Sequence, residues 1–308
     1  DGIEAVAIVT PNHMHAPVAN AFLGAGVHVI CDKPLALSLA EARRLRASAE
    51  ASGLVFCLTH NYTGYPLVRH ARAMVAAGEI GDIRLVQVEY PQDWLTTDLE
   101  TTGQKQAEWR TDPARSGAGG CIGDIGTHAF NLADFVTGLE VAELSAEVTT
   151  FVPGRRLDDN VQVMLRYANG ARGLLWASQV APGNENGLQL RVYGTKGGLE
   201  WRQDNPNYLK FTPFGEAPRL IGRGTGGVGP AGARVTRIPS GHPEGYLEAF
   251  ATIYSEAAAA IRAAQAGTPL SPEVIYPTIA DGVKGLAFID TALRSSRGNG
   301  RWLKMPAA

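Results

Sequence analysis

A glycine-rich turn followed by a carboxylate and an imidazole is the part of this sequence with the clearest chemical potential. Gly119 and Gly120 precede Asp124, and His128 follows four residues later in an apolar stretch that predicts a helix to Phe135. Side chains with this spacing share one face of a helix, and glycine lets a ligand or other backbone approach closely. A carboxylate beside an imidazole can orient a bound hydroxyl and move its proton. The alternative is a capped helix with an ordinary surface Asp–His pair.

Lys33 is the second residue whose position points to chemistry. It follows the apolar run 27–31 and Asp32, and it precedes Pro34, which cannot continue a strand. We therefore expect its ammonium group at the carboxyl end of a buried strand. There it could donate a hydrogen bond to a substrate hydroxyl and make that hydroxyl more acidic. The alternative is a strand-end lysine surrounded by water.

Strand and helix patterns alternate three times in the N-terminal part of the chain. The predicted strands are 5–9, which we expect to be central, 27–31 and 54–58, and the predicted helices are 16–24, 38–51 and 66–77. Ser38 and Glu41 have the spacing of a capping box at the start of the second helix. Such alternation is typical of a parallel sheet with helices on its faces.

Polar residues follow all three predicted strands. They are Thr10 and Asn12, Asp32 and Lys33, and His60 and Asn61. Each pair alone could serve only as a cap or a turn. Ligands of parallel sheets bind beyond the carboxyl ends of the strands, which meet at one edge. Three polar strand ends therefore predict a binding cleft.

From residue 83 onward the pattern changes to short strands separated by turns. The predicted strands are 83–90, 142–152, 161–167, 171–179, 188–193, 198–202 and 209–212, with helices at 124–135, 243–266 and 277–296. This spacing indicates an antiparallel sheet. The expected fold class is α/β plus α+β: a doubly wound parallel sheet in residues 1–78, then a domain with an open antiparallel sheet in residues 79–308. The last helix could pack back on the first domain.

Two short motifs are rejected as ligand sites. Gly224–Gly229 reads G-x-G-x-x-G, but no strand of adequate length precedes it and Pro230 follows where a helix should begin. We expect a mobile loop there. His13 and His15 have no third ligand at a suitable spacing, so no metal site is predicted.

For three other segments, the sequence is compatible with both a binding role and a structural role. Trp109-Arg110 could stack on a ring and bind a phosphate, or it could pack as a hinge between domains. Asp158-Asp159-Asn160 reads as a turn cluster before a strand but could border a polar site. His242–Tyr246 opens a helix, with side chains that point either into the cleft or to solvent.

The composition excludes several classes of partner. The chain has 308 residues, long enough for two domains, and a formal net charge of −2. Without a basic excess we expect neither nucleic acid nor a membrane as a partner. Cys31, Cys57 and Cys121 lack metal spacing, which indicates reduced thiols and a cytoplasmic location. The chain starts at Asp1 without a methionine, so the sequence leaves a preceding targeting segment open.

Together these features resemble the Gfo/Idh/MocA oxidoreductases, the family of glucose–fructose oxidoreductase and inositol dehydrogenase. The resemblance runs from Asp1 to about Trp302. The motifs that carry it are Thr10-Pro11-Asn12 with His15, Asp32-Lys33-Pro34, the run 78–83, Trp109-Arg110, and Gly119-Gly120 with Asp124 and His128. Tyr90–Trp94 and His242–Tyr246 resemble the levoglucosan-dehydrogenase-like branch.

The resemblance implies a Rossmann domain followed by an open antiparallel sheet, NAD or NADP as cofactor, and hydride transfer at a sugar-like carbon. It implies that His128 is the general base, that Lys33 hydrogen-bonds the same oxygen, and that Asp124 binds a neighbouring hydroxyl or orients the histidine. Tyr90 and His242 would join them in substrate binding. The cofactor would contact Thr10, Pro11, Asn12, His15, Asp32, Lys33, Pro34, Asn61, Trp109 and Arg110.

The chain departs from the family pattern in two places. Where the family usually has an aspartate three residues after the histidine, this chain has Asn131. The family's first strand, its G-x-G-x-x-G turn and the residue that selects NAD or NADP have no counterpart, a difference of roughly 60 residues or more. Because the remaining catalytic pattern is intact, we expect a fragment rather than a protein that no longer binds a dinucleotide normally.

The leading hypothesis is an NAD(P)-dependent dehydrogenase of a secondary alcohol on a sugar, anhydrosugar or cyclitol, or the reverse reduction. One alternative is a non-catalytic sugar-sensing or assembly protein on the same fold. Another is a lyase or hydrolase that works through transient oxidation with tightly held NAD. The open sheet has a face that needs covering, so we expect homo-oligomers, either dimers or tetramers.

Overall fold

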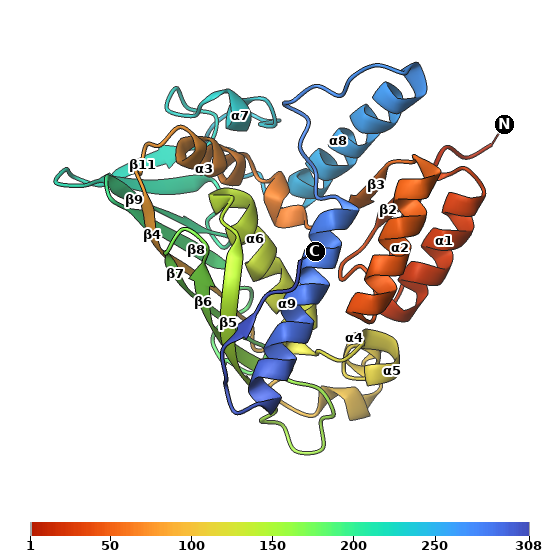
Figure 1. Ribbon diagram of the computed structural model, residues 1–308. Helices are drawn as coiled ribbons and strands as arrows, with labels where there is room; N and C mark the ends of the chain where they lie inside the picture. The colour runs from red at the N-terminus through yellow and green to blue at the C-terminus, as the bar shows by residue number, and fades with distance from the viewer. Residues whose placement is uncertain (1, 308) are drawn as a thin grey trace.

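A three-stranded parallel sheet forms the N-terminal part of the computed structural model, which describes residues 2–307 (Figure 1). Its strands lie in the order β1-β2-β3. The predicted alternation of strand and helix is confirmed, with boundaries that differ by no more than two residues. In chain order the elements are β1 (Ala5–Ile8), α1 (His15–Gly24), β2 (His28–Cys31), α2 (Leu39–Ser52), β3 (Phe56–Leu58) and α3 (Pro66–Ala76).

The start of α2 shows how local sequence fixes a boundary. The Ser38 hydroxyl accepts the Glu41 N–H at 3.3 Å, as a capping residue does. The Glu41 carboxylate accepts the Leu37 N–H at 2.9 Å, one residue before the position that a capping box predicts. Gly53 ends the helix with φ +65°, a left-handed conformation that glycine adopts readily.

The first strand differs from its prediction as a central strand. Among residues 2–307, β1 pairs only with β2, so it lies at the edge of its sheet. Ile8 is buried, but Ala5 and Ala7 are exposed. Val9, which follows the strand, is 68% exposed. Within residues 2–307, the apolar run therefore has one face turned to the core, at Ile8, and one exposed face, at Ala5, Ala7 and Val9.

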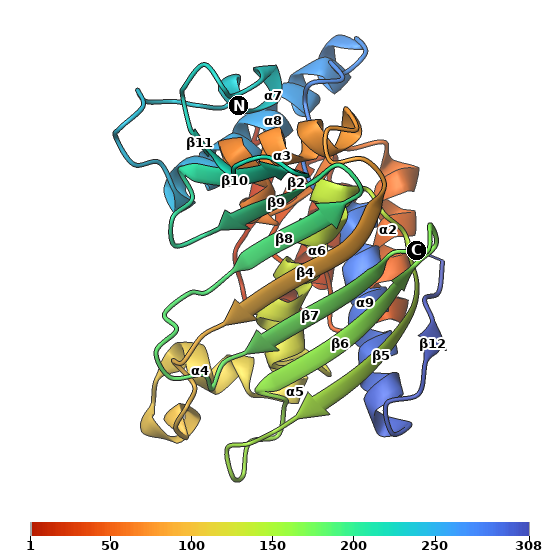
Figure 2. The same ribbon diagram turned by 90° about the vertical axis from the view of Figure 1, so that its left-hand side faces the viewer.

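A nine-stranded sheet forms the second part, in the order β11-β10-β9-β8-β4-β7-β6-β5-β12 (Figure 2). All seven strands predicted here are present. The short strands β11 and β12 were not predicted, because four and two residues carry too little pattern. The strands are β4 (Ile83–Pro91), β5 (Val141–Thr149), β6 (Asn160–Tyr167), β7 (Arg172–Ser178), β8 (Gln189–Gly194), β9 (Gly197–Arg202), β10 (Tyr208–Pro213), β11 (Arg219–Gly222) and β12 (Leu303–Lys304).

This sheet is mixed rather than purely antiparallel. β4 and β7 pair in parallel along seven residue pairs, from Leu85–Arg172 to Pro91–Ser178, while the other pairings are antiparallel. Parallel neighbours require a long crossover connection. The segment between β4 and β7 provides it, because it includes three helices and two further strands.

Helices cover one face of the large sheet and leave the other open (Figures 1 and 2). On β6, Val163 and Leu165 point to the covered face and are buried, whereas Gln162 and Met164 lie on the open face. On the covered face, Phe130 of α6 stacks on Phe288 of α9 with ring centroids 4.4 Å apart. The helices of this part are α4 (Lys105–Arg110), α5 (Pro113–Ser116), α6 (Thr127–Thr137), α7 (Pro230–Ala233), α8 (Tyr246–Ala266) and α9 (Ile279–Arg297).

Two of these helices also contact the N-terminal part. α9 packs against α2 and β3, and α8 packs against β2 and the turn Asn61–Gly64. The two sheets are thereby held against each other at the carboxyl ends of β2 and β3. Within residues 2–307, no helix combines the length and the hydropathy that crossing a membrane would require.

Candidate active site

A cavity of about 480 Å³ lies where the N-terminal sheet meets the large sheet. The ends of β2, β3 and β4, the helices α4 and α6, and the first turns of α8 contribute to its walls. The predicted cleft is present at β2 and β3, but Thr10 and Asn12, after β1, do not line it. The lining residues are Asp32, Lys33, Thr59, Asn61, Tyr62, Tyr90, Gln92, Trp94, Gln104, Gln106, Arg110, Asp124, Ile125, His128, Tyr246 and Phe250.

Lys33 and Asp124 form an ion pair on the cavity wall. The Lys33 Nζ donates to the Asp124 Oδ1 at 2.9 Å and to the Asp124 carbonyl at 2.5 Å. The other carboxylate oxygen accepts from Gln179 at 2.8 Å and lies 3.5 Å from the Arg110 Nε. Burial acts to raise the pKa of Asp124, but the two cations outweigh it and lower the pKa to about 2. Asp124 is therefore ionised at neutral pH.

His128 lies in the same cavity among aromatic rings. Its ring meets those of Tyr62 and His60 edge to face, with centroids 4.9 and 5.3 Å away. Its Nδ1 is buried and has no hydrogen-bond partner within residues 2–307. Burial, followed by the positive charge of Lys33, holds the pKa of His128 well below its usual value. The imidazole is therefore neutral and able to accept a proton.

The predicted link between Asp124 and His128 is not direct. The segment Ile122–Gly126 is a single π-helical stretch, and α6 starts after it at Thr127. Such stretches often occur at functional sites. The hydrogen-bond partners of the Asp124 carboxylate in the described structure are Lys33 and Gln179, so it does not orient the histidine. The two side chains share a cavity rather than a hydrogen bond.

A tyrosine–amide network lines the wall next to His128. The hydroxyls of Tyr62 and Tyr90 hydrogen-bond each other, and Tyr90 donates to the Asn186 Oδ1 at 2.7 Å. Gln92 donates to the same oxygen at 2.8 Å and accepts from the Trp94 indole at 3.1 Å. Burial raises the pKa of Tyr62 to about 12, so its hydroxyl stays protonated. Of these five residues, sequence analysis singled out only Tyr90 as a site residue.

Four of the ten predicted cofactor residues line the cavity: Asp32, Lys33, Asn61 and Arg110. Among these, Asn61 is 2% exposed and its Nδ2 has no hydrogen-bond partner within residues 2–307. A buried amide without a partner is costly. Asn61 thus has the character of a group that binds a ligand.

The other six predicted cofactor residues are Thr10, Pro11, Asn12, His15, Pro34 and Trp109, and none of them lines the cavity. His15 is buried, and its ring nitrogens lie 2.8 Å from the Pro34 carbonyl oxygen and 2.9 Å from the Thr10 carbonyl oxygen, so the neutral ring donates to one of the two. Asn12 donates to the Ser116 carbonyl at 2.9 Å. The side chains of His15 and Asn12 therefore hold the strand ends in place.

The structure corrects the expectation for His242. Its side chain is exposed and lies outside the cavity lining. The chain turns here because buried Glu244 binds Arg223 at 3.1 Å and accepts the N–H groups of Arg237 and Ile238. Tyr246, in the first turn of α8, lines the cavity instead.

Trp109 and Arg110 stack on each other at the end of α4. The Arg110 guanidinium carbon lies 4.2 Å from the Trp109 ring centroid. Arg110 also reaches Asp124, so the pair joins α4 to the ion pair on the opposite wall. No group of three or more His, Cys, Asp or Glu side chains within residues 2–307 is arranged to hold a metal ion.

Comparison with known proteins identifies the family. Residues 1–60 match the model described as "Oxidoreductase family, NAD-binding Rossmann fold", and residues 68–200 match "GFO/IDH/MocA C-terminal domain". The chain therefore belongs to the Gfo/Idh/MocA oxidoreductases, an NAD-binding family. The resemblance seen in the sequence and the expected pair of sheets are confirmed.

Three relatives illustrate the similarity. An oxidoreductase from Sinorhizobium meliloti is 57% identical with a TM-score of 0.89, over 98% of this chain and 80% of that one. An inositol dehydrogenase homolog from Azotobacter vinelandii, complexed with NADH and myo-inositol, is 35% identical with a TM-score of 0.92, over 98% and 78%. The levoglucosan dehydrogenase of Pseudarthrobacter phenanthrenivorans is 30% identical over 99% of this chain and 80% of its own length.

Proposed function

We propose that this protein is an NAD(P)-dependent dehydrogenase that oxidises a secondary alcohol of a sugar, anhydrosugar or cyclitol, or catalyses the reverse reduction. The observation that carries the proposal is a neutral His128 in the same cavity as the Lys33–Asp124 pair. Levoglucosan dehydrogenase and the inositol dehydrogenase homolog support the substrate class. The amide and tyrosine side chains on the other walls can hydrogen-bond several hydroxyl groups of one ring.

Each of the three residues has a distinct role in the proposed reaction. His128 takes the proton of the hydroxyl group that is oxidised. Lys33 donates a hydrogen bond to the same oxygen and stabilises the negative charge that develops on it. Asp124 fixes the Lys33 ammonium group and offers its carboxylate to a neighbouring hydroxyl. Tyr90 supports this wall through Tyr62, and the proposal gives no role to His242.

Asn61 would hold the nicotinamide end of the cofactor, because its buried amide has no hydrogen-bond partner at Nδ2 within residues 2–307. Asp32 and Arg110 complete this side of the cavity, with Trp109 beside Arg110. When bound, the cofactor would supply the acceptor for the hydride that leaves the alcohol carbon. Thr10 and Pro11 would contact it beyond β1, while His15 acts by holding Thr10 and Pro34.

The test compares variants of the protein expressed from its complete gene. With levoglucosan or myo-inositol and either NAD⁺ or NADP⁺, Lys33→Met and His128→Ala should each lower kcat by roughly 10²- to 10⁴-fold. Lys284→Met is the matched control, since Lys284 pairs with Asp134 at 3.0 Å outside the cavity. It should leave kcat unchanged. The proposal fails if the two cavity variants turn over as fast as the wild type.

The same assay separates the alternative functions. A lyase or hydrolase with tightly held NAD would release dinucleotide on denaturation but give no net reduction of added cofactor. A sugar-sensing protein would bind sugars without turnover. Titration with NADH and NADPH, followed by fluorescence of Trp94 and Trp109, distinguishes the preferred cofactor, because Trp94 lines the cavity.

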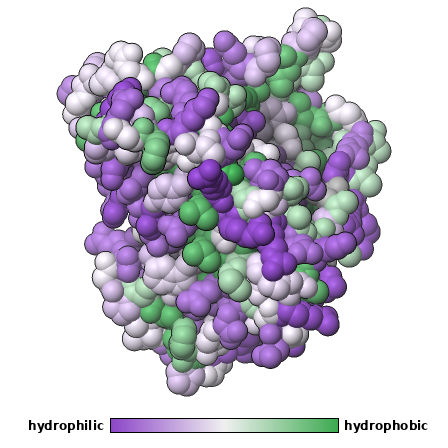
Figure 3. Space-filling view, turned by 60° about the vertical axis from the view of Figure 1, so that its left-hand side comes forward, coloured by the Kyte–Doolittle hydropathy of each residue, from purple (hydrophilic) through white to green (hydrophobic). Residues whose placement is uncertain are grey.

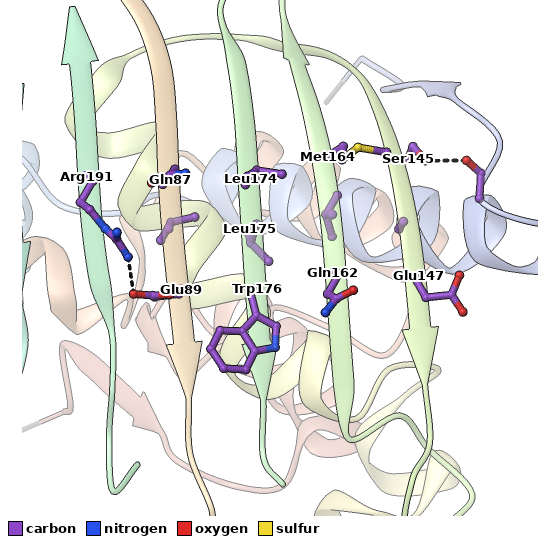
Figure 4. A pocket seen from close by; sticks show the side chains of 14 residues that line it. Gln87, Glu89, Ser145, Glu147, Gln162, Met164, Leu174, Leu175, Trp176 and Arg191 are labelled. Atoms are coloured by element: carbon purple, nitrogen blue, oxygen red, sulfur yellow. Dashed lines mark hydrogen bonds and ion pairs between the residues drawn. The ribbon is translucent and has the colours of Figure 1, made fainter. Parts of the chain in front are cut away.

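We also infer that the open face of the large sheet binds a second copy of this chain (Figure 4). Leu85, Met164 and Leu174 are each about half exposed there, at 50%, 48% and 52%. Some charged residues on this face are paired within the chain, as in Glu89–Arg191 at 2.5 Å, whereas the exposed Glu147 has no ion-pair partner within residues 2–307. Because apolar side chains lie between these charges, the face can bury apolar surface against its own copy across a two-fold axis. The resulting assembly would be a dimer, or a tetramer if a second interface exists.

We also propose a domain boundary and a cellular location for this protein. The chain divides into a dinucleotide-binding domain in residues 1–78 and a substrate-binding and oligomerisation domain in residues 79–308. The sharp change from parallel to mainly antiparallel pairing supports this boundary. A cytoplasmic location is supported by Cys31, Cys57 and Cys121, which are all free and buried.

A further inference from the structure

Two adjacent aspartates, Asp158 and Asp159, are buried directly before the start of β6 at Asn160. Their side chains are 6% and 0% exposed. The sequence predicted a turn cluster here, with a polar site as the alternative. Burying a carboxylate is unfavourable unless hydrogen bonds compensate. The proposed reaction uses neither residue directly, so their burial requires another role.

Asp158 binds three consecutive N–H groups of the glycine-rich turn. Its Oδ1 accepts the Gly120 N–H at 2.6 Å, and its Oδ2 accepts the Ile122 N–H at 2.8 Å. Its carbonyl oxygen accepts the Cys121 N–H at 2.8 Å. These donors lie just before and at the first residue of the π-helical stretch Ile122–Gly126, which carries Asp124, where N–H groups have no partners within the helix. Asp158 therefore caps the segment from another part of the chain.

The contact between Asp158 and the turn leaves no room for adjustment. A β-carbon at Gly120 would lie 2.3 Å from the Asp158 carbonyl oxygen and 2.9 Å from the Leu157 Cβ. Residue 120 must therefore be glycine for this approach. The turn is fixed from two sides, by hydrogen bonds and by close packing.

Two paths of contacts join Asp158 to Asp124. In the first, the Asp124 N–H donates to the Gly120 carbonyl at 2.8 Å, so Gly120 is bonded to both aspartates. In the second, the Gln179 N–H donates to the Asp159 carbonyl at 2.8 Å, and the Gln179 side chain donates to the Asp124 Oδ2 at 2.8 Å. The first path ends on the backbone N–H of Asp124, and the second ends on the carboxylate that holds Lys33.

We propose that Asp158 is a positioning residue: it sets the place of the Asp124 carboxylate, and through it the place of the Lys33 ammonium group, by clamping the turn at Gly120 and Ile122. The inference rests on the proposed dehydrogenase function and deepens it. Asp158 does not touch the cavity. Its effect on the reaction comes entirely from geometry, because a displacement of about 1 Å at a reacting group can lower a rate by roughly 100-fold.

The pKa of the Asp158 carboxyl group makes the clamp sensitive to pH. Burial raises its pKa to about 6, although the N–H groups of Ile122 and Gly120 act to lower it, and Asp159 raises it further. Other charged or titratable groups near this side are Cys121 in the turn, Asp124 beyond it, and Arg155, which is paired with Asp159 at 3.2 Å. Because the pKa is raised, the ionised form makes the fold less stable as pH increases from about 4 to about 6. Ionisation of Asp158 therefore does not add stability at neutral pH, although the ionised carboxylate accepts both N–H groups.

The test is Asp158→Asn in the protein expressed from its complete gene. Asparagine keeps the shape of the side chain but has one acceptor oxygen, so one of the two N–H groups loses its partner. We expect kcat to fall about 10- to 100-fold, while KM for the dinucleotide changes less than about twofold. The acid limb of kcat/KM near pH 6 in the wild type should be absent from the variant.

Asp281→Asn is the control, because Asp281 caps α9 by accepting the Thr278 N–H at 2.6 Å, away from the cavity. It should lower the unfolding temperature without changing kcat. The inference is overturned if Asp158→Asn keeps the wild-type kcat and pH profile. It is also overturned if both variants lose kcat only in proportion to their loss of stability.

Two measurements cover other outcomes. If Asp158→Asn does not fold, the amide shifts of Gly120 and Ile122 in the wild type should titrate with the same midpoint as kcat/KM, and separate midpoints overturn the inference. If the variant folds, its crystal structure should show the Asp124 Oδ1 displaced from its 2.9 Å contact with Lys33. An unchanged contact overturns the inference without reference to turnover, and so separates its failure from failure of the dehydrogenase proposal.

Discussion

Neighbouring ionisable groups in the cavity carry different charges because their surroundings differ. Asp124 is ionised because Lys33 and Arg110 lie beside it, and His128 is neutral because it is buried next to Lys33. Sites that separate acid and base roles depend on such opposed environments. A neutral base can therefore stand next to an ammonium group at neutral pH.

Asp124→Asn tests the charge of this pair through stability. The pKa of Asp124 is lowered from 3.8 to about 2, so its ionised form stabilises the fold above pH 4, and this contribution is lost as pH falls toward 2. We expect the wild type to lose about 2 kcal/mol relative to the variant between about pH 4 and pH 2. Urea unfolding across this range measures the difference.

Asp134→Asn is the matched control, because it removes a second Lys–Asp pair, in which Asp134 is 15% exposed and Lys284 is 41% exposed. Burial raises the pKa of Asp134, so the wild type should not lose stability relative to this variant over the same range. A difference between wild type and Asp124→Asn that stays constant with pH would contradict the assignment of charge.

The sequence predicted the groups that carry the chemistry but not the walls around them. Lys33, Asp124 and His128 follow recognisable strand and helix signals, and the structure places all three in one cavity. Gln92 and Asn186 reach the same wall from β4 and from the loop before β8, and no local pattern links them. His242 was predicted as a site residue from the resemblance of its segment to the levoglucosan-dehydrogenase-like branch, but its side chain is exposed and lies outside the cavity lining.

At the scale of elements, one buried arginine holds the loop between β4 and α4 that forms a wall of the cavity. Trp94 and Gln104 lie in this loop and line the cavity. The Arg155 side chain is 1% exposed. It donates to the carbonyls of Leu95 at 2.8 Å and Thr97 at 2.9 Å, to both Glu100 oxygens at 2.8 Å, and to the Asp159 Oδ2 at 3.2 Å.

Arg155→Met should therefore destabilise the protein and loosen this wall. Removing one partner of a buried charged network costs about 3–5 kcal/mol, because the remaining charges lose their compensation. We also expect KM for the sugar to rise more than KM for the dinucleotide. Arg156→Met is the control: its 64% exposed side chain pairs with Asp112, and such surface pairs contribute about 0–1 kcal/mol. If both variants lost the same free energy of unfolding, burial of the Arg155 network would not contribute to stability.

Helices and strands with a clear hydrophobic periodicity were predicted well. Features that depend on tertiary contacts were not. The capped start of α2 and the glycine at its end are readable from neighbouring residues alone. The parallel pairing of β4 with β7 depends on how the chain returns after a long connection, which periodicity does not record. The π-helical stretch at Ile122–Gly126 begins at N–H groups bound by Asp158, more than 30 residues later in the sequence, and no local pattern records that contact.

At the scale of the whole molecule, the open face of the large sheet is the surface that helices leave uncovered. Hydrophobic residues lie among hydrophilic ones on this side (Figure 3). Leu174 lies on β7, near the middle of the strand order, with Met164 on the adjacent strand β6. Two copies related by a two-fold axis would place these residues near each other across the contact.

Leu174→Lys should therefore weaken self-association. A lysine on the face would place an unpaired charge inside the contact, so the dimer dissociation constant should rise at least about 10-fold. Leu270→Lys, at a 40% exposed leucine beyond α8 and away from the sheet, should have no effect. Analytical ultracentrifugation of the wild type and both variants measures this. A wild type that sediments as a monomer at micromolar concentration would exclude the proposed assembly.

The cavity takes its reactive groups and its outer wall from different kinds of structure. Lys33, Asp124 and His128 stand on a strand end and a clamped helix start, whereas Trp94 and Gln104 stand on a loop fixed by Arg155. Substitutions in that loop can reshape the space for a substrate while the proton-transfer groups stay in place. Such a protein can acquire a new preference among polyols in small evolutionary steps, each of which keeps the reaction itself working.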